Sequence, residues 1–516
     1  MTDQQPMRPR QGDYRVAVEN FGPIVRAGID VRPLTIFVGP SNTGKSYLAI
    51  LLYVLHRCFG GADPYSYGTV FSRRRVWAFD SSDVPRRRRR PIYESLNEWA
   101  SVLSSSETPQ ELPSDVAGYL HSVLQAAEGL EGSVSYEIRR CFGIDNANNL
   151  VRRAGSDALA RICLSVPYQD SEARYDIELD SSGSRLAGHF PRVTSLPHGE
   201  GSDDSVRATR TVQRELRNMF AHGSSTFVHE RVLRLLMDSV ASSVLGPLYR
   251  NAYYLPADRT GVMHSHQVVV STIVQSAATT GLRPSPDVPM LSGVLTDFLD
   301  QLIGISGRKR GRQGRSRSGG ADLAGLLERN VLEGTVVMER GETGYPTFAY
   351  RPRGWREDIA LMRASSMVSE LAPVVLYLRY LVRSGDVLII EEPEAHLHPA
   401  MQAAFARELA RLVRAGVRIV MTTHSEWFLE QIGNLVRLAT LPKKKQAGIP
   451  GAEVALDSSE VGAWLFRRSG RPKGSIVEEV ELDPQTGLFR TGYDAVSDAL
   501  YNESAEIFNR LNEGVE

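Results

Sequence analysis

The sequence is poor in the features that mark several specialised protein classes. Its 516 residues include only three cysteines, Cys58, Cys141 and Cys163, which are too few and too scattered for a disulfide framework or a zinc knuckle. The longest apolar runs, such as 387–390, are far shorter than the roughly 20 residues that span a bilayer. The first 30 residues carry charges and no apolar core of a secretory signal. We therefore expect a cytoplasmic protein without a membrane span.

Net charge is also missing, because 60 basic residues balance 60 acidic ones. This balance does not indicate a dedicated nucleic-acid or membrane-surface protein. Lysine is scarce, with six lysines among the 60 basic residues, so Lys45 is conspicuous inside a motif. At roughly 150 residues per domain, the length allows two to four domains or one large domain with insertions.

Alternation of apolar strands and amphipathic helices is strongest in the C-terminal third. Together with a strand at 34–38 and a helix after it, this pattern indicates a mainly parallel α/β core. A small antiparallel meander is expected within 159–190. Helical patterns follow at about 207–221, 227–245, 263–278 and 288–303. Residues 304–320 hold six basic residues and no acid, which predicts a flexible loop.

A phosphate-binding pattern follows the strand at 34–38. The stretch fits GxxxxGK[ST] and consists of Gly39, Pro40, Ser41, Asn42, Thr43, Gly44, Lys45 and Ser46, with Tyr47 next in the helix. Its glycines let backbone N–H groups turn toward an anion, and the helix N-terminus adds partial positive charge. Lys45 can reach the β- and γ-phosphates, and the Ser46 hydroxyl can ligate Mg²⁺. The alternative is a chance match in a loop, which the flanking strand and helix argue against.

Two adjacent carboxylates, Glu391 and Glu392, end a second buried strand. Burial of a carboxylate is costly unless a cation or hydrogen bonds compensate. A nucleotide-bound Mg²⁺ would compensate if Glu391 held the metal and Glu392 polarised the attacking water. The alternative is a surface turn whose acids cap the next helix.

Two further segments suit a γ-phosphate. His424 ends the next predicted strand, where a neutral imidazole could bond the phosphate and sense its loss; it could also be an ordinary polar residue. Ser365, Ser366 and Ser369 open a helix, where serines are usual N-caps but could also contact a nucleotide held by a second subunit.

With these motifs in order, the chain resembles the ABC-type ATPases of the SMC, RecF and OLD kind, often labelled AAA-family ATPases in bacterial defence operons. The resemblance rests on NFGPI at 20–24, GPSNTGKS at 39–46, YLPADRTG at 254–261, SSMVSEL at 365–371, EEPEAHLHP at 391–399 and TTHSE at 422–426. It implies that Lys45, Glu392 and His424 are catalytic and that Ser46 and Glu391 hold Mg²⁺. It also implies a signature-like motif at Ser365, Ser366 and Ser369, although the usual paired glycines are absent. By the same resemblance, a dimer-interface loop consists of Ala395, His396, Leu397 and His398.

The fold implied by the resemblance is a P-loop NTPase, an ABC-type ATPase head with a mixed sheet and an antiparallel meander, interrupted by a mostly helical insertion. The N-terminal part of the head would be 1–60, the insertion 61–250, a helical segment 251–333 and the C-terminal part of the head 334–516. Long heptad runs are absent from the middle of the sequence, so a long coiled-coil arm is not expected. ATP would be sandwiched between two heads of a homo-oligomer.

The sequence and the resemblance together favour an ATPase that acts as a sensor or switch, with anti-phage defence alongside a separate effector as the first choice. A RecF-like DNA repair ATPase and a non-hydrolysing scaffold held together by ATP are the alternatives. The basic runs at 86–90, 308–317 and 443–445 could contact DNA or RNA irrespective of base sequence, or could simply be solvated. No acid cluster with metal-site spacing follows His424, so a nuclease is not expected in this chain.

Overall fold

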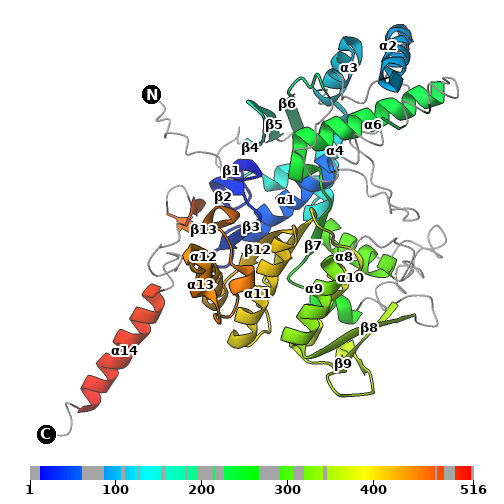
Figure 1. Ribbon diagram of the computed structural model, residues 1–516. Coiled ribbons are helices and arrows are strands. Elements are labelled where there is room, and N and C mark those ends of the chain that lie inside the picture. The colour runs from blue at the N-terminus through cyan, green and yellow to red at the C-terminus, as the bar shows by residue number, and fades with distance from the viewer. Residues whose placement is uncertain are drawn as a thin grey trace, which may run out of the picture.

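The computed structural model describes residues 12–60, 86–105, 111–125, 128–152, 159–180, 183–195, 213–214, 218, 226–265, 291–305, 319–340, 346–470, 473–480 and 494–512. One large sheet with helices on both faces makes up the body of the molecule (Figure 1). The helix patterns expected at 207–221 and 263–278 and the basic segment 304–320 lie mostly outside these residues.

The described residues form an eleven-stranded mixed sheet in the order β6-β5-β4-β1-β2-β14-β13-β3-β12-β11-β7. The five strands from β13 to β7 run parallel, whereas most pairs from β13 to β6 are antiparallel. The strand bounds are β1 (Tyr14–Phe21), β2 (Ile24–Val31), β3 (Leu34–Val38), β4 (Ala160–Tyr168), β5 (Ser171–Asp180), β6 (Gly183–His189), β7 (Ala252–Leu255), β11 (Val387–Glu391), β12 (Arg418–Thr423), β13 (Val461–Ser469) and β14 (Gly474–Glu479). This arrangement confirms the expected mixed α/β fold.

The parallel strands β3 and β11 are buried along their whole length, as strands covered on both faces should be. Alternate side chains enter two separate cores, because successive residues of a strand point to opposite faces. Phe37 packs in the core on one face with helix α1, while Ile36 and Val38 pack in the core on the other face with α10 to α12. The centre of the sheet is therefore fixed from both sides.

The helices divide between these two cores. On the face of Phe37 lie α1 (Lys45–Phe59), α2 (Arg86–Ser105), α3 (Ser114–Gln125), α4 (Glu128–Phe142) and α6 (Thr226–Leu245). On the other face lie α9 (Gly319–Leu327), α10 (Ser366–Tyr380), α11 (Pro399–Arg414) and α12 (Glu426–Thr440), while α8 (Gly293–Ile305) contributes to both cores. Beyond these come the short α13 (Lys443–Gln446) and the outlying α14 (Asp494–Asn512).

The antiparallel meander expected at 159–190 is present as β4, β5 and β6, but it does not stand apart from the head. Strand β4 pairs with β1, with Val16 opposite Leu164, so the meander extends the sheet that carries the phosphate loop. Strand β2 was not expected from the sequence. A separate small sheet consists of β8 (Gly334–Arg340), β9 (Pro346–Pro352) and β10 (Ile359–Ala360).

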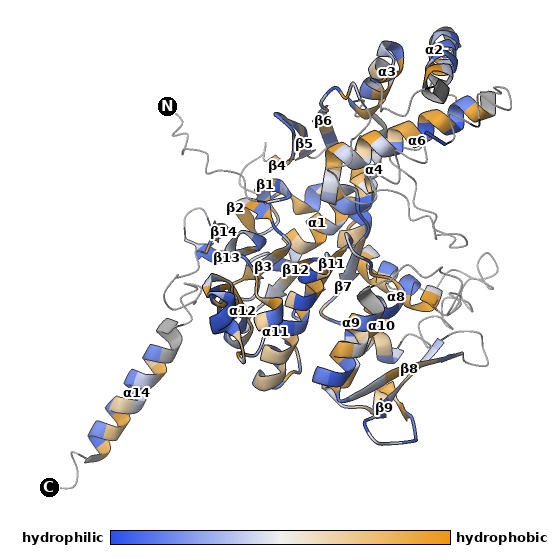
Figure 2. Ribbon diagram, in the orientation of Figure 1, coloured by the Kyte–Doolittle hydropathy of each residue, from blue (hydrophilic) through white to orange (hydrophobic). Residues whose placement is uncertain are grey.

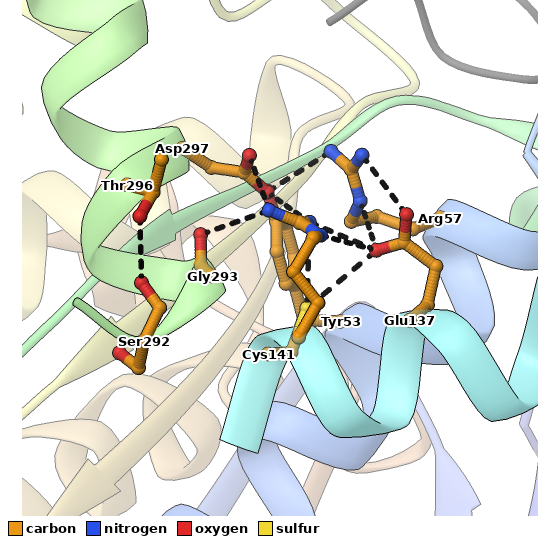
Figure 3. A network of polar contacts seen from close by, with 9 residues as sticks. Tyr53, Arg57, Glu137, Cys141, Ser292, Gly293, Thr296 and Asp297 are labelled. Carbon is orange, nitrogen blue, oxygen red and sulfur yellow. Dashed lines mark hydrogen bonds and ion pairs between the residues drawn. The ribbon is translucent and has the colours of Figure 1, made fainter. Parts of the chain in front are cut away.

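A buried network of charged side chains joins α1, α4 and α8 (Figure 3). Arg57 lies 2.8 Å from Glu137 and 3.0 Å from Asp297, measured between nitrogen and oxygen. Arg140 lies 2.8 Å and 2.7 Å from the same two carboxylates, and the Tyr53 hydroxyl donates to Asp297 at 2.8 Å. Two cations and two anions thus compensate one another and connect α1, the helix after the phosphate loop, to α4 and α8.

Among the residues that the structure describes, one helical stretch, Val228–Tyr249, is long and apolar enough to cross a membrane by length and composition, contrary to the expectation from the sequence. Its mean hydropathy is 1.2, and 56% of its residues are buried inside the protein. A core helix of a soluble protein passes the same test, so the finding is weak support for a span. All three cysteines are free thiols.

Candidate nucleotide-binding site

The phosphate loop, Glu391, Glu392 and His424 meet at the carboxyl edge of the parallel strands. Here β3 leads into the phosphate loop, β11 ends at Glu391, and β12 leads to His424. The strand register brings these ends together. Strand β12 pairs with β11 and with β3, so that Thr422 lies opposite Glu391 and Thr423 lies opposite Val38. Ligands of open α/β sheets bind at this edge.

Two glycines of the phosphate loop have conformations that other residues rarely adopt. Gly39 has φ +139° and Gly44 has φ +101°. A Cβ at Gly39 would lie 2.5 Å from the Phe466 carbonyl oxygen, and one at Gly44 would lie 2.8 Å from the Ile24 side chain. Both glycines are therefore required by the local backbone and its neighbours.

The remaining loop residues divide between solvent and interior. Pro40, Ser41, Asn42, Ser46 and Tyr47 are exposed, whereas Thr43 is buried and donates to the Pro40 carbonyl at 2.8 Å. The Lys45 ammonium folds back and donates to the carbonyls of Gly39 and Pro40 at 2.8 and 2.9 Å. Burial lowers the pKa of Lys45 to about 8, although the negative charges of the nearby glutamates act in the opposite direction.

A pocket of about 380 Å³ opens beside this loop. Asn42 lines it together with three cationic side chains, Arg152, Arg468 and Lys473. Arg468 also donates to the Ser41 carbonyl at 3.2 Å. The surroundings of the phosphate loop are thus suited to an anion.

Glu391 is buried, and one of its carboxylate oxygens has no hydrogen-bond partner among the described residues. Oε2 accepts a hydrogen bond from the Ala257 N–H at 3.2 Å, while Oε1 is buried without a hydrogen-bond partner. Burial raises the pKa of Glu391, and the Ser46 and Tyr254 hydroxyls counteract this. A buried oxygen beside a serine hydroxyl fits Mg²⁺, which is often held by one or two carboxylates plus substrate phosphates. Within the described residues, no three or more His, Cys, Asp or Glu side chains are grouped as a metal site.

Glu392 stands at the turn after β11 with an unusual φ of +42°. Its N–H donates to the Thr422 carbonyl at 3.0 Å, and its side chain is 45% exposed. Oε1 lies 3.6 Å from His424 Nε2, and the contact with His424 lowers the pKa of Glu392, aided by Lys45 and Arg259. The structure therefore brings Glu392, His424 and Lys45 together around one solvent-accessible edge, with Glu392 ionised near neutral pH.

A third acid of the string EEPEAHLHP, Glu394, has a role that the sequence does not reveal. Its Oε1 accepts hydrogen bonds from the Thr423 hydroxyl and the His424 N–H, both at 2.7 Å. Burial raises the pKa of Glu394. Glu394 thus fixes the backbone that carries His424, and its place inside EEPEAHLHP was the only signal for it.

Arg259 is the second residue whose role the sequence did not reveal. It is fully buried and donates to the backbone carbonyls of Glu391 at 2.6 Å and Glu392 at 3.1 Å. Its charge is matched by an ion pair with Glu370 of α10, which also accepts a hydrogen bond from Thr260. Arg259 therefore ties the loop after β7 and helix α10 to the backbone of both site glutamates. The string YLPADRTG contained it without indicating a partner.

The signature-like serines do not share one environment. Ser365 caps α10 by accepting from the Val368 N–H at 3.4 Å, and both Ser365 and Ser366 are exposed. Ser369 is fully buried, lies 3.0 Å from His264 Nε2 and donates to the Leu361 carbonyl at 3.1 Å. One helical turn thus carries Ser369 inward in the single chain, away from Ser365 and Ser366, and its contact with a nucleotide across a dimer stays a prediction.

The predicted interface loop also needs one correction. His396 and His398 are exposed, and His398 caps α11 by accepting from the Ala400 N–H at 3.3 Å. Ala395 is partly buried, but Leu397 is only 6% exposed and packs in the core with α11 and α12. Leu397 anchors the loop and does not belong to its surface.

Comparison with known proteins gives one family and several distant structural likenesses. Residues 333–429 match the family described as AAA ATPase domain. No curated protein matches the chain.

Three solved structures of SMC heads overlap most of the chain. The first is a SmcHead bound to the C-winged helix domain of ScpA, with TM-score 0.39 and 9% identity over 91% of this chain and 97% of that one. The second is a Smc head with an extended coiled coil bound to the C-terminal domain of ScpA, derived from Pyrococcus furiosus, with TM-score 0.37 and 9% identity over 91% of this chain and 96% of that one. The third is the SMC head domain from Thermotoga maritima, with TM-score 0.33 and 11% identity over 90% of this chain and 98% of that one. Scores of this size do not by themselves establish a shared fold.

The likeness to a known family concerns residues 333–429, and the geometry of the sheet edge is consistent with it. The match covers α10, β11 and β12, which carry the glutamates and the histidine, and β3 adds the phosphate loop beside them. Residues 333–429 are therefore similar to an AAA ATPase domain, within a mixed α/β fold whose sheet edge places a phosphate loop beside two glutamates and a histidine.

Proposed function

We propose that this protein binds ATP with Mg²⁺ and hydrolyses it slowly as a nucleotide-driven switch. The observation that carries the proposal is the convergence of Lys45, Glu391 and Glu392 at one edge of the sheet, close enough for their charges to interact. A cation from one end of the chain and two carboxylates from the other serve no evident packing purpose there. They suit phosphoryl transfer, in which positioning and electrostatics do most of the work.

Each side chain has a separate task in this scheme. Lys45 leaves the carbonyls of Gly39 and Pro40 and binds the β- and γ-phosphates. Glu391 and Ser46 hold Mg²⁺, which when bound neutralises charge on the phosphate oxygens. Glu392 accepts a proton from the attacking water, and His424, 3.6 Å away, contacts the γ-phosphate.

The decisive experiment compares Lys45→Ala with Glu392→Gln. We expect Lys45→Ala to lose ATP binding, measured by equilibrium titration with ATP and Mg²⁺. Glu392→Gln should bind ATP like the wild type but lose at least about 100-fold in phosphate release, because only the proton acceptor is removed. Wild-type turnover in Glu392→Gln would show that another group activates water.

For the assembly, we propose that two heads sandwich ATP, with the exposed Ser365 and Ser366 facing the nucleotide of the partner head. The biological role we favour is anti-phage defence with a separate effector, supported by resemblance to ATPases of defence operons. Strong ATP-dependent binding to duplex DNA would favour the RecF-like alternative instead. Intact ATP binding with no measurable turnover would favour a scaffold held together by the nucleotide.

A further inference from the structure

The C-terminal helix α14 carries an apolar face that nothing in the described chain covers. Five large side chains on it are between 54% and 75% exposed, namely Leu500, Tyr501, Ile507, Phe508 and Leu511. Their spacing gathers them on one side of the helix. Figure 2 shows hydrophobic patches along α14, which extends away from the body of the molecule. An exposed apolar stripe of this size marks a contact surface.

The charges of α14 restrict what that contact can be. The helix has four acidic residues, Asp494, Asp498, Glu503 and Glu506, and a single basic one, Arg510. Amphipathic helices that lie on membranes usually carry lysine and arginine on the polar side, because bilayer surfaces are often anionic. The acidic character of α14 favours a protein surface with positive charge.

Such a surface exists on the head of the same chain. A groove of about 480 Å³ lies between α11, the end of α12 and the segment after it. Leu438, Leu441 and Ile449 give it an apolar lining, and Leu441 and Ile449 are 36% and 41% exposed. Arg407 and Arg437 also line it, and the exposed lysines 443–445 lie close by in sequence. The groove therefore has the apolarity and the charge that α14 requires.

We propose that α14 of one copy packs its apolar face into this groove of a second copy. Within the part of the chain that the structure describes, helix and groove are both uncovered, so each is available to its counterpart on another chain. A reciprocal exchange forms the contact twice and closes a two-fold dimer. Recognition of an amphipathic helix by an apolar groove is a common mode of protein association.

This dimer does not depend on nucleotide, because the groove is built from the far end of α12 and not from the sheet edge that holds the phosphate loop. A further consequence rests on the proposed function. Two heads already linked through α14 would meet at a raised effective concentration when ATP closes them. The helix exchange itself stands or falls independently of ATP hydrolysis.

The test is the molar mass of the full chain without nucleotide, measured by sedimentation velocity over a concentration series. We expect a dimer for the wild type and for Lys45→Ala, and a dimer dissociation constant at least tenfold higher for Ile507→Asp/Phe508→Asp. Leu441→Asp/Ile449→Asp in the groove should weaken the dimer equally. The matched control Asn502→Asp/Asn509→Asp adds the same charge to the opposite side of α14 and should leave the dimer intact. A monomeric wild type, or apolar-face variants that dimerise normally, would overturn the proposal.

A disulfide test distinguishes exchange between copies from docking within one chain. Leu511→Cys and Ile449→Cys chains, mixed and oxidised, should yield a covalent heterodimer that the same mixture with Asn509→Cys in place of Leu511→Cys does not. A chain that carries both cysteines and closes an intrachain bond while remaining monomeric would refute the second copy as occupant. Binding of the monomer to phosphatidylserine vesicles, lost in Ile507→Asp/Phe508→Asp, would refute the proposal in favour of a membrane.

Discussion

Arg259 donates a hydrogen bond of 2.6 Å from its buried guanidinium to the main-chain carbonyl of Glu391. Neither residue is near the other in sequence, and the contact joins the loop after β7 to the end of β11. Arg259 also donates to the Glu392 carbonyl and forms an ion pair with Glu370. This one ion pair therefore supports the backbone of both Glu391 and Glu392.

The substitution Arg259→Lys should lower the turnover of ATP by about 10- to 100-fold, while the ATP dissociation constant changes little. Losses of this size are usual when a residue that orients the ligands of a metal site is replaced. A lysine has no planar fork with which to bridge two carbonyls and a carboxylate. Steady-state and equilibrium titrations give the two constants separately. Glu370→Gln, which keeps hydrogen-bonding atoms but loses charge, should show a smaller effect of the same kind. Equal losses in binding and turnover would point to general unfolding of the site.

The variant Arg259→Met should lower the free energy of unfolding. It leaves the Glu370 carboxylate buried without its cation, which typically costs about 3–5 kcal/mol. Denaturant unfolding should therefore show a lower free energy of unfolding, and the double variant Arg259→Met/Glu370→Met should recover part of it. An unchanged free energy in Arg259→Met would mean that water reaches Glu370.

The pKa of Lys45 predicts proton uptake on ATP binding. Burial lowers this pKa to about 8 in the free protein, so above that pH the amine is partly neutral. A bound triphosphate favours the ammonium and raises the pKa again. ATP binding near pH 9 should therefore take up protons, and calorimetry in two buffers of different ionisation enthalpy should give different heats.

The control for that experiment is Lys45→Arg, whose guanidinium stays protonated at about pH 9. Its ATP affinity should be weaker, but its binding heat should not depend on the buffer. The lowered pKa of Lys45 also makes the stability of the fold depend on pH. The unfolded chain holds the Lys45 proton up to a pKa of about 10.4, so between pH 8 and that value the nucleotide-free fold gains stability as pH rises. Identical wild-type heats in both buffers would contradict the prediction.

Glu391→Ala should weaken the Mg²⁺ dependence of ATP binding rather than ATP binding as such. The buried Oε1 without a hydrogen-bond partner is the oxygen expected to face the metal, and its loss removes the protein's carboxylate ligand. Titration of Mg²⁺ at fixed ATP should show a midpoint at least about tenfold higher than in the wild type. Glu394→Ala, which removes a neighbouring half-buried acid that binds the His424 backbone, should leave that midpoint nearly unchanged.

The network between α1, α4 and α8 predicts sensitivity to acid. Burial acts to raise the pKa of Asp297 and Glu137, but Arg57 and Arg140 outweigh it and hold both values below the usual range. Such carboxylates stabilise the fold above their unfolded pKa of about 4 and lose that contribution as pH falls through the lowered folded value. Asp297→Asn should cost about 3–5 kcal/mol at neutral pH and flatten the fall in stability below about pH 4. A parallel, unflattened profile would show that the network does not carry the acid response.

Local chemistry made part of the site predictable. The phosphate loop depends on glycines at two positions of positive φ, on a strand before it and on a helix after it, and all of these lie within 34–59 of the chain. The strands ending at Glu391 and His424 were predictable for a similar reason, since their apolar residues form continuous runs bounded by polar ones. Because the carboxyl ends of adjacent parallel strands share one edge, their proximity followed once a parallel sheet was assumed.

Contacts between distant segments were not predictable in this way. Ser369 resembles Ser365 and Ser366 in the sequence, yet its place one turn further along α10 buries it against His264. Leu397 lies between two exposed histidines but packs inward. Arg259 and Glu370 are 111 residues apart in the sequence, and no local pattern predicts that they form an ion pair.

The sequence by itself determined which residues can bind phosphate, hold a metal ion and accept a proton, because those abilities depend on side-chain chemistry and on spacing within a few residues. Only the tertiary structure decided how the strands combine across the chain, so that β4 extends the head sheet through β1 and a buried arginine orients both glutamates. The physical reason is that burial and ion pairing between remote segments depend on the whole fold, in which each buried charge must find its partner.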